Sequence, residues 1–189
     1  YLFSMSNLPI WNLADFYPSF KSKHISDDLK SLLNDTNSFL KKYKNKLKLL
    51  TNDKLVKSIK EYEKLEERIY FIKSFSFLTH CTDQLNKEKN KFYQSTDERL
   101  SEIEKNLIFY GIEINKLNKN KISVLKKSKY NSWVANLNKF KRFQQSETIE
   151  KLLMEKSITS SSAWIKFFDQ TMTRLKFDFR KKKLTETEI

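Results

Sequence analysis

The side chains that could carry catalysis or bind a metal ion are few and scattered. The chain has two histidines, His24 and His80, and one cysteine, Cys81. His80-Cys81-Thr82-Asp83 is the one local cluster of ligand types. A zinc site needs three or four converging ligands, and a hydrolytic site usually places two histidines on one helical turn. Adjacent helical residues point in different directions. We therefore interpret this cluster as structural, and the same geometry argues against a Cys-His nucleophilic pair.

Acidic residues gather at Glu61, Glu63, Glu66 and Glu67, in a segment rich in lysine. Paired carboxylates can act as general acid and base. Lysines three or four residues away on a helix would instead hold them in ordinary ion pairs, and we favour that interpretation. With Gly111 as the one glycine, the sequence has no glycine-rich phosphate loop and no glycine-flanked serine. We predict no catalytic, cofactor-binding or metal-binding residue in this chain.

The composition indicates an all-α fold. A chain of 189 residues is long enough for one domain or one lobe of a larger protein. Tight β-hairpins need glycine at positive φ, so a single glycine argues against an extensive sheet. A hydrophobic content of 39% and an aromatic content of 14% are enough to build a core. We expect nearly all of the chain beyond Ser26 to be helical.

A long antiparallel helical hairpin over residues 53–117 forms the centre of the predicted lobe. Apolar positions in both arms alternate in steps of three and four, which keeps one stripe of each helix facing its partner. The polar residues 82–87 are where the chain would reverse. At about 1.5 Å per residue each arm would be about 40–45 Å long. The first stripe consists of Leu55, Ile59, Tyr62, Leu65, Ile69, Ile72 and Phe75, and the second of Tyr93, Thr96, Leu100, Ile103, Leu107, Tyr110, Ile114 and Leu117.

Shorter segments precede the hairpin. Residues 1–25 are predicted to form an extended arm laid over a groove, because Pro9 and Pro18 disfavour helix in the residues before them. Trp11, Leu13, Phe16 and Tyr17 would hold this arm, although an exposed aromatic recognition strip is an alternative. Ser26-Asp27-Asp28 would cap the next helix. We interpret the lysine-rich run 41–46 as a solvated helix end and linker.

Beyond the hairpin we expect a break at residues 119–121 and then three further helices. The first passes through Trp133 and Phe143, the second begins at Ser146, and the third is capped by residues 160–162. Residues 26–175 would thus form the helical lobe, and residues 176–189 the start of a truncated following segment. The alternation of Phe177 and Phe179 with polar residues predicts a short strand there.

The formal charge of +14 has two explanations, a partner that carries phosphates or simply lysine-rich codon usage. Sequence-reading proteins rely on arginine forks, whereas the basic residues here are mostly lysine. We therefore favour codon usage over a nucleic-acid partner as the explanation of the charge. The lone cysteine predicts a reducing compartment, and the sequence has no membrane-spanning run and no signal peptide. These features predict a cytoplasmic protein without a membrane partner, and the chain ends suggest a piece of a longer polypeptide.

The chain carries a series of motifs at residues 8–18, 62–65, 146–157 and 160–168. In this order they resemble bacterial oligoendopeptidase F, a branch of the thimet-oligopeptidase-like zinc metallopeptidases. The opening of that family follows the pattern L-P-x-W-D/N-L-x-D-L/F-Y-P, and later segments read yE-x-L, L-S-E-x-x-E-x-I/L-L-x-E-K and G-x-x-A-W-x-x-L-F. Asn12 stands where the family often has Asp, and the glycines expected near Ser160 are absent. These four patterns correspond in order to the four stretches here, and the pair Phe177 and Phe179 follows them.

The resemblance implies the N-terminal lobe of a zinc-dependent oligoendopeptidase that hydrolyses short peptides. The lobe would form part of the substrate-channel wall and would hold no cofactor. The H-E-x-x-H helix and the third ligand of the family would lie downstream of Ile189, where zinc-activated water and a glutamate base cleave the peptide bond. The implied partners are the downstream catalytic domain of the same polypeptide and an oligopeptide substrate. Such a lobe should expose an apolar patch for that domain. A stand-alone helical interaction module, or a basic nucleic-acid-binding protein, remains the alternative.

Overall fold

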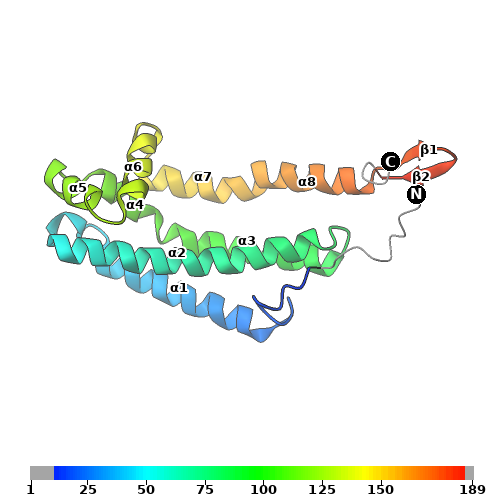
Figure 1. The fold of residues 1–189 in the computed structure, drawn as a ribbon, viewed down its shortest axis with the longest axis horizontal. Helices are drawn as coiled ribbons and strands as arrows, with labels where there is room; N and C mark the ends of the chain where they lie inside the picture. Colours follow the sequence, from blue (N-terminus) through cyan, green and yellow to red (C-terminus); the bar gives the residue numbers. More distant parts are fainter. Residues whose placement is uncertain (1–10, 186–189) are drawn as a thin grey trace.

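The computed structural model describes residues 11–185, which fold into eight α-helices and one β-hairpin (Figure 1). The all-α prediction and the short strand near the C-terminus are confirmed. The helices are α1 (Lys23–Tyr43), α2 (Asn52–Cys81), α3 (Lys87–Lys105), α4 (Ile108–Asn115), α5 (Lys119–Lys126), α6 (Asn131–Phe140), α7 (Glu147–Thr159) and α8 (Ser161–Arg174). Two 3₁₀ turns, Leu47–Leu49 and Lys141–Phe143, join neighbouring helices, and the strands are β1 (Phe177–Phe179) and β2 (Lys182–Leu184).

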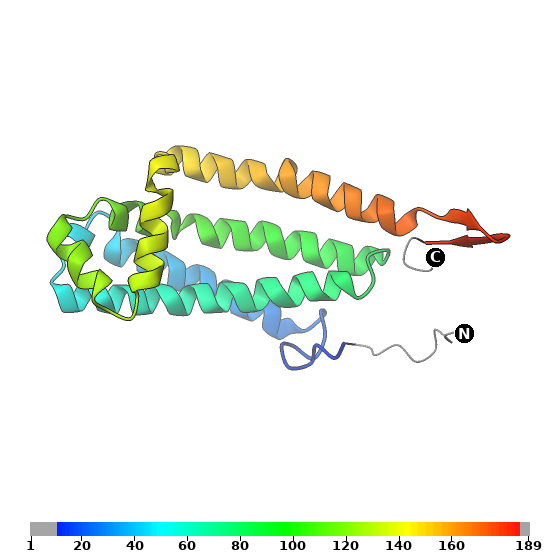
Figure 2. The ribbon, with the colours of Figure 1, turned by 45° about the horizontal axis from the view of Figure 1, so that its top comes forward.

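The antiparallel pair α2 and α3 forms the predicted hairpin (Figure 2). Asn86 closes the turn between them, because its side-chain oxygen accepts hydrogen bonds from the backbone N–H of Glu88 and Lys89 at 3.0 and 3.1 Å. This interaction satisfies two free donors at the start of α3. The centres of both apolar stripes are buried, with Leu55, Ile69, Leu100 and Tyr110 fully enclosed.

The periodicity suggested that the second arm of the hairpin is one continuous helix, but the structure divides it into two. It is interrupted at Asn106 and Leu107, where the backbone tightens into turns with i→i+3 hydrogen bonds. The Asn106 side chain donates there to Thr36 Oγ1 and Asn37 Oδ1 of α1, at 3.3 and 3.1 Å. A short 3₁₀-like turn changes the helix path without reversing the chain. Leu107 therefore stays buried, and the apolar stripe runs on into α4.

Helix α1 packs against α2 and α3 and completes a three-helix core. Its buried face includes Leu29, Leu32 and Phe39, which repeat in steps that match the helical period. The helix begins at Lys23, three residues before the predicted cap, with Ser22 as N-cap residue. Phe39 lies 5.2 Å, centroid to centroid, from the ring of Tyr110, so aromatic contacts link α1 to α4 as well.

The segment before α1 is anchored by fewer side chains than predicted, and its first ten residues lie outside the described part of the chain. Trp11 is exposed, so its predicted anchoring role is wrong. Around residues 14–16 the chain forms a turn rather than an extended arm, because the backbone N–H groups of Phe16 and Tyr17 bond to the carbonyl of Leu13. Tyr17 is buried and donates to Asp28 Oδ2 at 2.8 Å.

The C-terminal part of the lobe turns across one end of the hairpin and then returns along it. Helices α5 and α6 pack together at that end, and α7 and α8 run back in line beside α3 (Figure 2). The predicted break at residues 119–121 is displaced, because those residues begin α5 and the break lies just before them. Asn118 caps α5 by accepting from the backbone N–H of Lys121 at 3.0 Å. Asn118 therefore caps a helix whose first three residues, 119–121, were predicted to form a break.

The β-hairpin follows α8 and pairs Phe177 with Leu184 and Phe179 with Lys182. Arg180 and Lys181 form its turn, with positive φ angles of 46° and 65°. Two-residue hairpin turns of this kind usually contain glycine or asparagine, because positive φ is costly for other residues. The structure thus confirms the short strand that the alternation of Phe177 and Phe179 with polar residues predicted. The hairpin extends the lobe beyond its helices.

Candidate functional site

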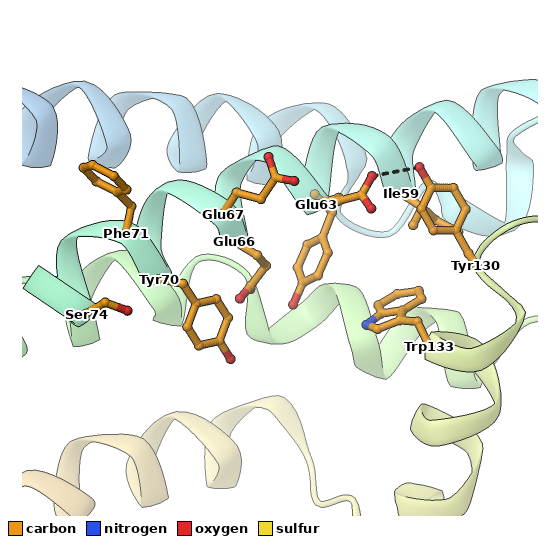
Figure 3. Close-up of a pocket in the computed structure, with 10 residues that line it drawn as sticks. Ile59, Glu63, Glu66, Glu67, Tyr70, Phe71, Ser74, Tyr130 and Trp133 are labelled. Atoms are coloured by element: carbon orange, nitrogen blue, oxygen red, sulfur yellow. Dashed lines mark hydrogen bonds between the residues drawn. The ribbon is translucent and has the colours of Figure 1, made fainter. Parts of the chain in front are cut away.

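A cavity of about 670 Å³ lies beside α2 (Figure 3). Its long wall is one face of α2 between Ile59 and Ser74. Tyr130, just before α6, and Trp133, in its first turn, close the Ile59 end of the cavity. Ligand sites in proteins typically have volumes of about 300–1,000 Å³. The cavity is therefore large enough for a small molecule or a few residues of a peptide.

Helical spacing explains why these α2 residues share one wall. Glu63, Glu66 and Tyr70 follow one another at intervals of three and four, so they lie on the same face of the helix. This face adjoins the buried stripe that contains Leu65 and Ile69. The core thus fixes the helix, and the adjacent face is left to line the cavity.

Aromatic packing beneath the cavity holds its floor in place. The rings of Tyr62 and Tyr110 stack with centroids 4.7 Å apart, and Tyr62 also contacts Trp133 at 5.7 Å. Tyr110 is anchored in turn, because its hydroxyl lies 2.7 Å from Ser58 Oγ. Offset stacking of this kind adds to the stabilisation that burial alone provides. The cavity therefore has a preformed aromatic surface.

Two carboxylates at the cavity have different environments. Glu63 Oε2 accepts from the hydroxyl of Tyr130 at 3.1 Å and from Lys129 Nζ at 3.3 Å. Burial raises the pKa of Glu66, and the carboxylate of Glu104 raises it further, while a hydrogen bond from Tyr62 and the charge of Lys73 oppose the change. Glu66 is thus a partly desolvated acid without a salt bridge among the residues of the described chain.

The residues considered as metal ligands or nucleophiles do not converge. His80 is buried, with Nδ1 2.7 Å from Asn90 Oδ1 and its ring stacked on Tyr93 at 5.0 Å. Cys81 is exposed, and partial burial together with the charge of Asp169 raises the pKa of its thiol, which is the opposite of activation. His24 lies on the exposed side of α1. Within residues 11–185 no group of three or more His, Cys, Asp or Glu could hold a metal ion, so this part of the chain does not fit a zinc site.

The acidic residues of α2 are paired differently from our interpretation. Glu61 accepts from Lys42 of α1 at 2.7 Å, and from Tyr43 at 2.8 Å, rather than from a lysine one turn away. Glu63 likewise bonds to Lys129, which lies just before α6. Interhelical packing places these partners nearer than the lysines of α2 itself. The prediction of ion pairs with lysines three or four residues away on α2 is therefore wrong for Glu61 and Glu63.

Helices α7 and α8 carry a broad apolar surface that the rest of the described chain does not cover. Neither helix buries a single residue completely. Trp164 is 71% exposed and Phe168 63% exposed, although bulky apolar groups are favoured inside a core. Exposed apolar surface on this scale usually marks an interaction site. We call α7 and α8 together the C-terminal arm. Its exposed apolar residues are Ile149, Leu152, Leu153, Trp164, Ile165, Phe167 and Phe168, with Leu175, Phe177 and Phe179 beyond it.

No helix among residues 11–185 combines the length and apolar character needed to cross a membrane. Searches of curated proteins and of solved structures found no match to this chain. The scan of family models did find one match, over residues 113–177. The matched region runs from the last three residues of α4 through α5, α6, α7 and α8 to the start of β1.

The two later sequence motifs, at residues 146–157 and 160–168, lie inside the matched region, whereas the opening motif and residues 62–65 lie outside it. The cavity is divided in the same way, since Tyr130 and Trp133 fall within the match and the α2 wall does not. The sequence resemblance is confirmed for residues 113–177, which match the N-terminal model of the family described as Oligopeptidase F.

Proposed function

We propose that this chain is the N-terminal helical lobe of a zinc-dependent oligoendopeptidase that hydrolyses short peptides. The observation that carries the proposal is the match of residues 113–177 to the Oligopeptidase F model. In this proposal the lobe forms part of the wall of the substrate channel, and its partners are the catalytic domain of the same polypeptide and the oligopeptide itself.

The apolar surface of α7 and α8 supports this role. It lies within the matched segment, and its large side chains remain exposed in the described chain. A catalytic domain packed over Trp164 and Phe168 would remove this surface from water, which is the main favourable term in domain association. In this proposal the zinc ligands lie elsewhere in the polypeptide, since the described residues contain no group of three or more His, Cys, Asp or Glu that could hold a metal ion.

The first test is to determine the coding sequence beyond the codon for Ile189 and to express any longer product. We expect an in-frame H-E-x-x-H helix with a downstream glutamate. The longer protein should bind one zinc ion per chain, measured by mass spectrometry, and should cleave an internally quenched peptide. The 189-residue chain serves as the matched control and should do neither. A stop codon directly after Ile189, or zinc-dependent cleavage by the shorter chain, would contradict the proposal.

A stand-alone helical interaction module is the second candidate, and the same exposed arm supports it, because such a surface also suits an independent protein partner. The coding sequence separates the two candidates. A native protein that stops near Ile189 would favour the interaction module, whereas an attached metallopeptidase domain would favour the channel wall.

A further inference from the structure

The cavity beside α2 combines two features that recognise a flat organic cation. One is its aromatic surface, formed by the stacked Tyr62 together with Tyr70 and Trp133. The other is the set of carboxylates that projects from α2, at Glu63, Glu66 and Glu67. The face of an aromatic ring attracts a cation through its quadrupole, and Arg prefers to stack there. This cavity therefore differs from an acidic cluster on an open surface.

The charge at the cavity is opposite to that of the molecule as a whole. The chain carries a formal charge of +14, and yet three of the residues that line this cavity are glutamates. Two nearby lysines pair with other carboxylates: Lys129 with Glu63, which also lines the cavity, and Lys73 with Glu104, at 3.2 Å. Glu66 and Glu67 form no salt bridge within the described chain. Their negative charge is thus left to interact with a bound group.

The desolvation of Glu66 strengthens this argument. Glu66 is partly buried and accepts a hydrogen bond from Tyr62, but it has no ion-pair partner in the described chain. An incoming cation with good hydrogen-bond geometry would offset the cost of its partial desolvation. A guanidinium group presents several N–H donors in one plane, so it can face a carboxylate while its flat surface lies against an aromatic ring. An ammonium group offers a point charge but cannot stack in this way.

We propose that this cavity binds a guanidinium group on an aliphatic stem, as an arginine side chain of a short peptide presents it. The carboxylate of Glu66 pairs with the guanidinium, and Tyr70 and Trp133 contact its stem and flat face. Glu67, the next residue on α2, points in a different direction and adds negative charge at the exposed edge of the cavity. The cavity is long enough along α2, from Ile59 to Ser74, to receive residues that flank the arginine. The peptide as carrier rests on the proposed function, whereas the guanidinium site does not.

A single-tryptophan variant allows a direct test. Trp11 and Trp164 are both exposed, so Trp11→Phe with Trp164→Phe should fold normally and leave Trp133 as the indole reporter in the cavity. The ligand is the blocked tripeptide acetyl-Ala-Arg-Ala-amide, and its control contains citrulline, a neutral analogue of similar shape. Calorimetry on the same protein detects binding that leaves the fluorescence unchanged. We expect saturable binding of the arginine peptide about tenfold tighter than that of the citrulline peptide.

Charge-neutral variants identify the residues responsible. Glu66→Gln and Glu67→Gln should each weaken binding of the arginine peptide severalfold and bring its affinity close to that of the citrulline peptide. Glu98→Gln is the matched control, because Glu98 is an exposed glutamate of α3 outside the cavity. Thermal unfolding of each variant checks that the fold is retained. Glu67→Gln provides an independent test if Glu66→Gln fails to fold, because Glu67 is exposed.

Three results would each overturn the guanidinium site: equal affinities for the arginine and citrulline peptides, no saturable binding by either method, or unchanged affinity in both glutamate variants. Titration with free arginine amide shows whether the site requires a peptide or only an arginine side chain. If it binds as tightly as the tripeptide, the guanidinium site stands and the peptide carrier is wrong. Arginine-dependent binding by a protein whose gene encodes no metallopeptidase domain would retain the site and contradict the proposed function alone.

Discussion

Lys44 Nζ lies 2.6 Å from Glu147 Oε1 and joins the end of α1 to the first residue of α7, across 103 positions of sequence. Lys151, one turn further along α7, also contacts Glu147 Oε1, at 2.8 Å. The lysine-rich run 41–46 is thus not merely a solvated helix end, as its composition suggested. One of its members fixes the point where the C-terminal arm leaves the rest of the lobe.

Glu147→Gln should lower the free energy of unfolding at pH 7 by about 0.5–1 kcal/mol, because partly exposed ion pairs contribute little more. Burial alone would raise the pKa of Glu147, but hydrogen bonds from Lys151 and Lys44 outweigh it and hold the pKa below its ordinary value of 4.5. A carboxyl whose pKa is lowered by folding stabilises the protein above the unfolded-state pKa. This contribution is lost as the pH falls below 4.5 and through the lower folded-state pKa.

Urea unfolding of Glu147→Gln and the unmodified chain at pH 7 and pH 3 measures this effect. The difference between the two proteins should shrink at pH 3. Glu98→Gln, a substitution at an exposed site, is the control for a general effect of lost charge. An equal difference at both pH values would show that the ionised carboxylate is not what stabilises this contact.

The sequence predicted the hairpin well, because its information is local. The stripe from Leu55 to Phe75 follows the helical period, and a regular stripe needs no knowledge of distant residues. The same regularity hid the break at Asn106, since the apolar spacing continues through it into Tyr110. Only the position of α1 shows why Asn106 is turned toward Thr36 and Asn37.

The cavity could be predicted only in part. Glu63, Glu66 and Tyr70 share a helical face that adjoins the core stripe, and this pattern could have indicated a functional wall. The opposing wall depends on Trp133, whose approach to Tyr62 results from tertiary packing between segments far apart in sequence. The exposure of Trp11 has a related cause, because an aromatic residue is buried only where a neighbouring surface receives it.

Tyr110→Phe tests the buried hydrogen bond that supports the cavity floor. Ser58 Oγ donates its one proton to the carbonyl of Leu55 at 2.6 Å, so the hydroxyl of Tyr110 is the donor in its 2.7 Å contact with Ser58. The substitution keeps the ring and removes this donor. We expect unfolding free energy to fall by about 1–2 kcal/mol in urea titrations. Tyr70→Phe, which alters an exposed hydroxyl, should change it much less. Equal effects would contradict the role of the Ser58 contact.

Replacing a leucine by alanine should cost much more unfolding free energy in the core than in the exposed arm. Leu100 is fully buried between the helices, so Leu100→Ala should cost about 2–5 kcal/mol of unfolding free energy. Leu152 is 51% exposed on α7, so Leu152→Ala should lower the free energy of unfolding by only about 0.5 kcal/mol. Chemical denaturation monitored by circular dichroism measures both variants. Similar costs would mean that the arm is covered in solution, for example by a second copy of the chain.

Asn86→Ala tests the turn between α2 and α3. The Asn86 side chain accepts from two backbone N–H groups, and loss of such a cap typically costs about 1 kcal/mol. Thr51→Ala provides a matched comparison, because Thr51 is the N-cap residue of α2 and its side chain makes no capping hydrogen bond. Thermal melts of the two variants should differ, with the larger drop in Tm for Asn86→Ala. Equal drops would rule out the side-chain cap as a determinant of the hairpin turn.

The lack of fully buried residues in α7 and α8 also has a consequence for the order in which the lobe opens. Segments with few enclosed contacts form separate cooperative units that open locally before global unfolding. Beyond its base, the arm is tied to the hairpin by contacts such as Thr173 with Gln84, at 2.7 Å, and Lys166 over the ring of Tyr93, at 4.6 Å. Amide protons of α8 should therefore exchange with deuterium long before those of α2, while the three-helix core remains protected.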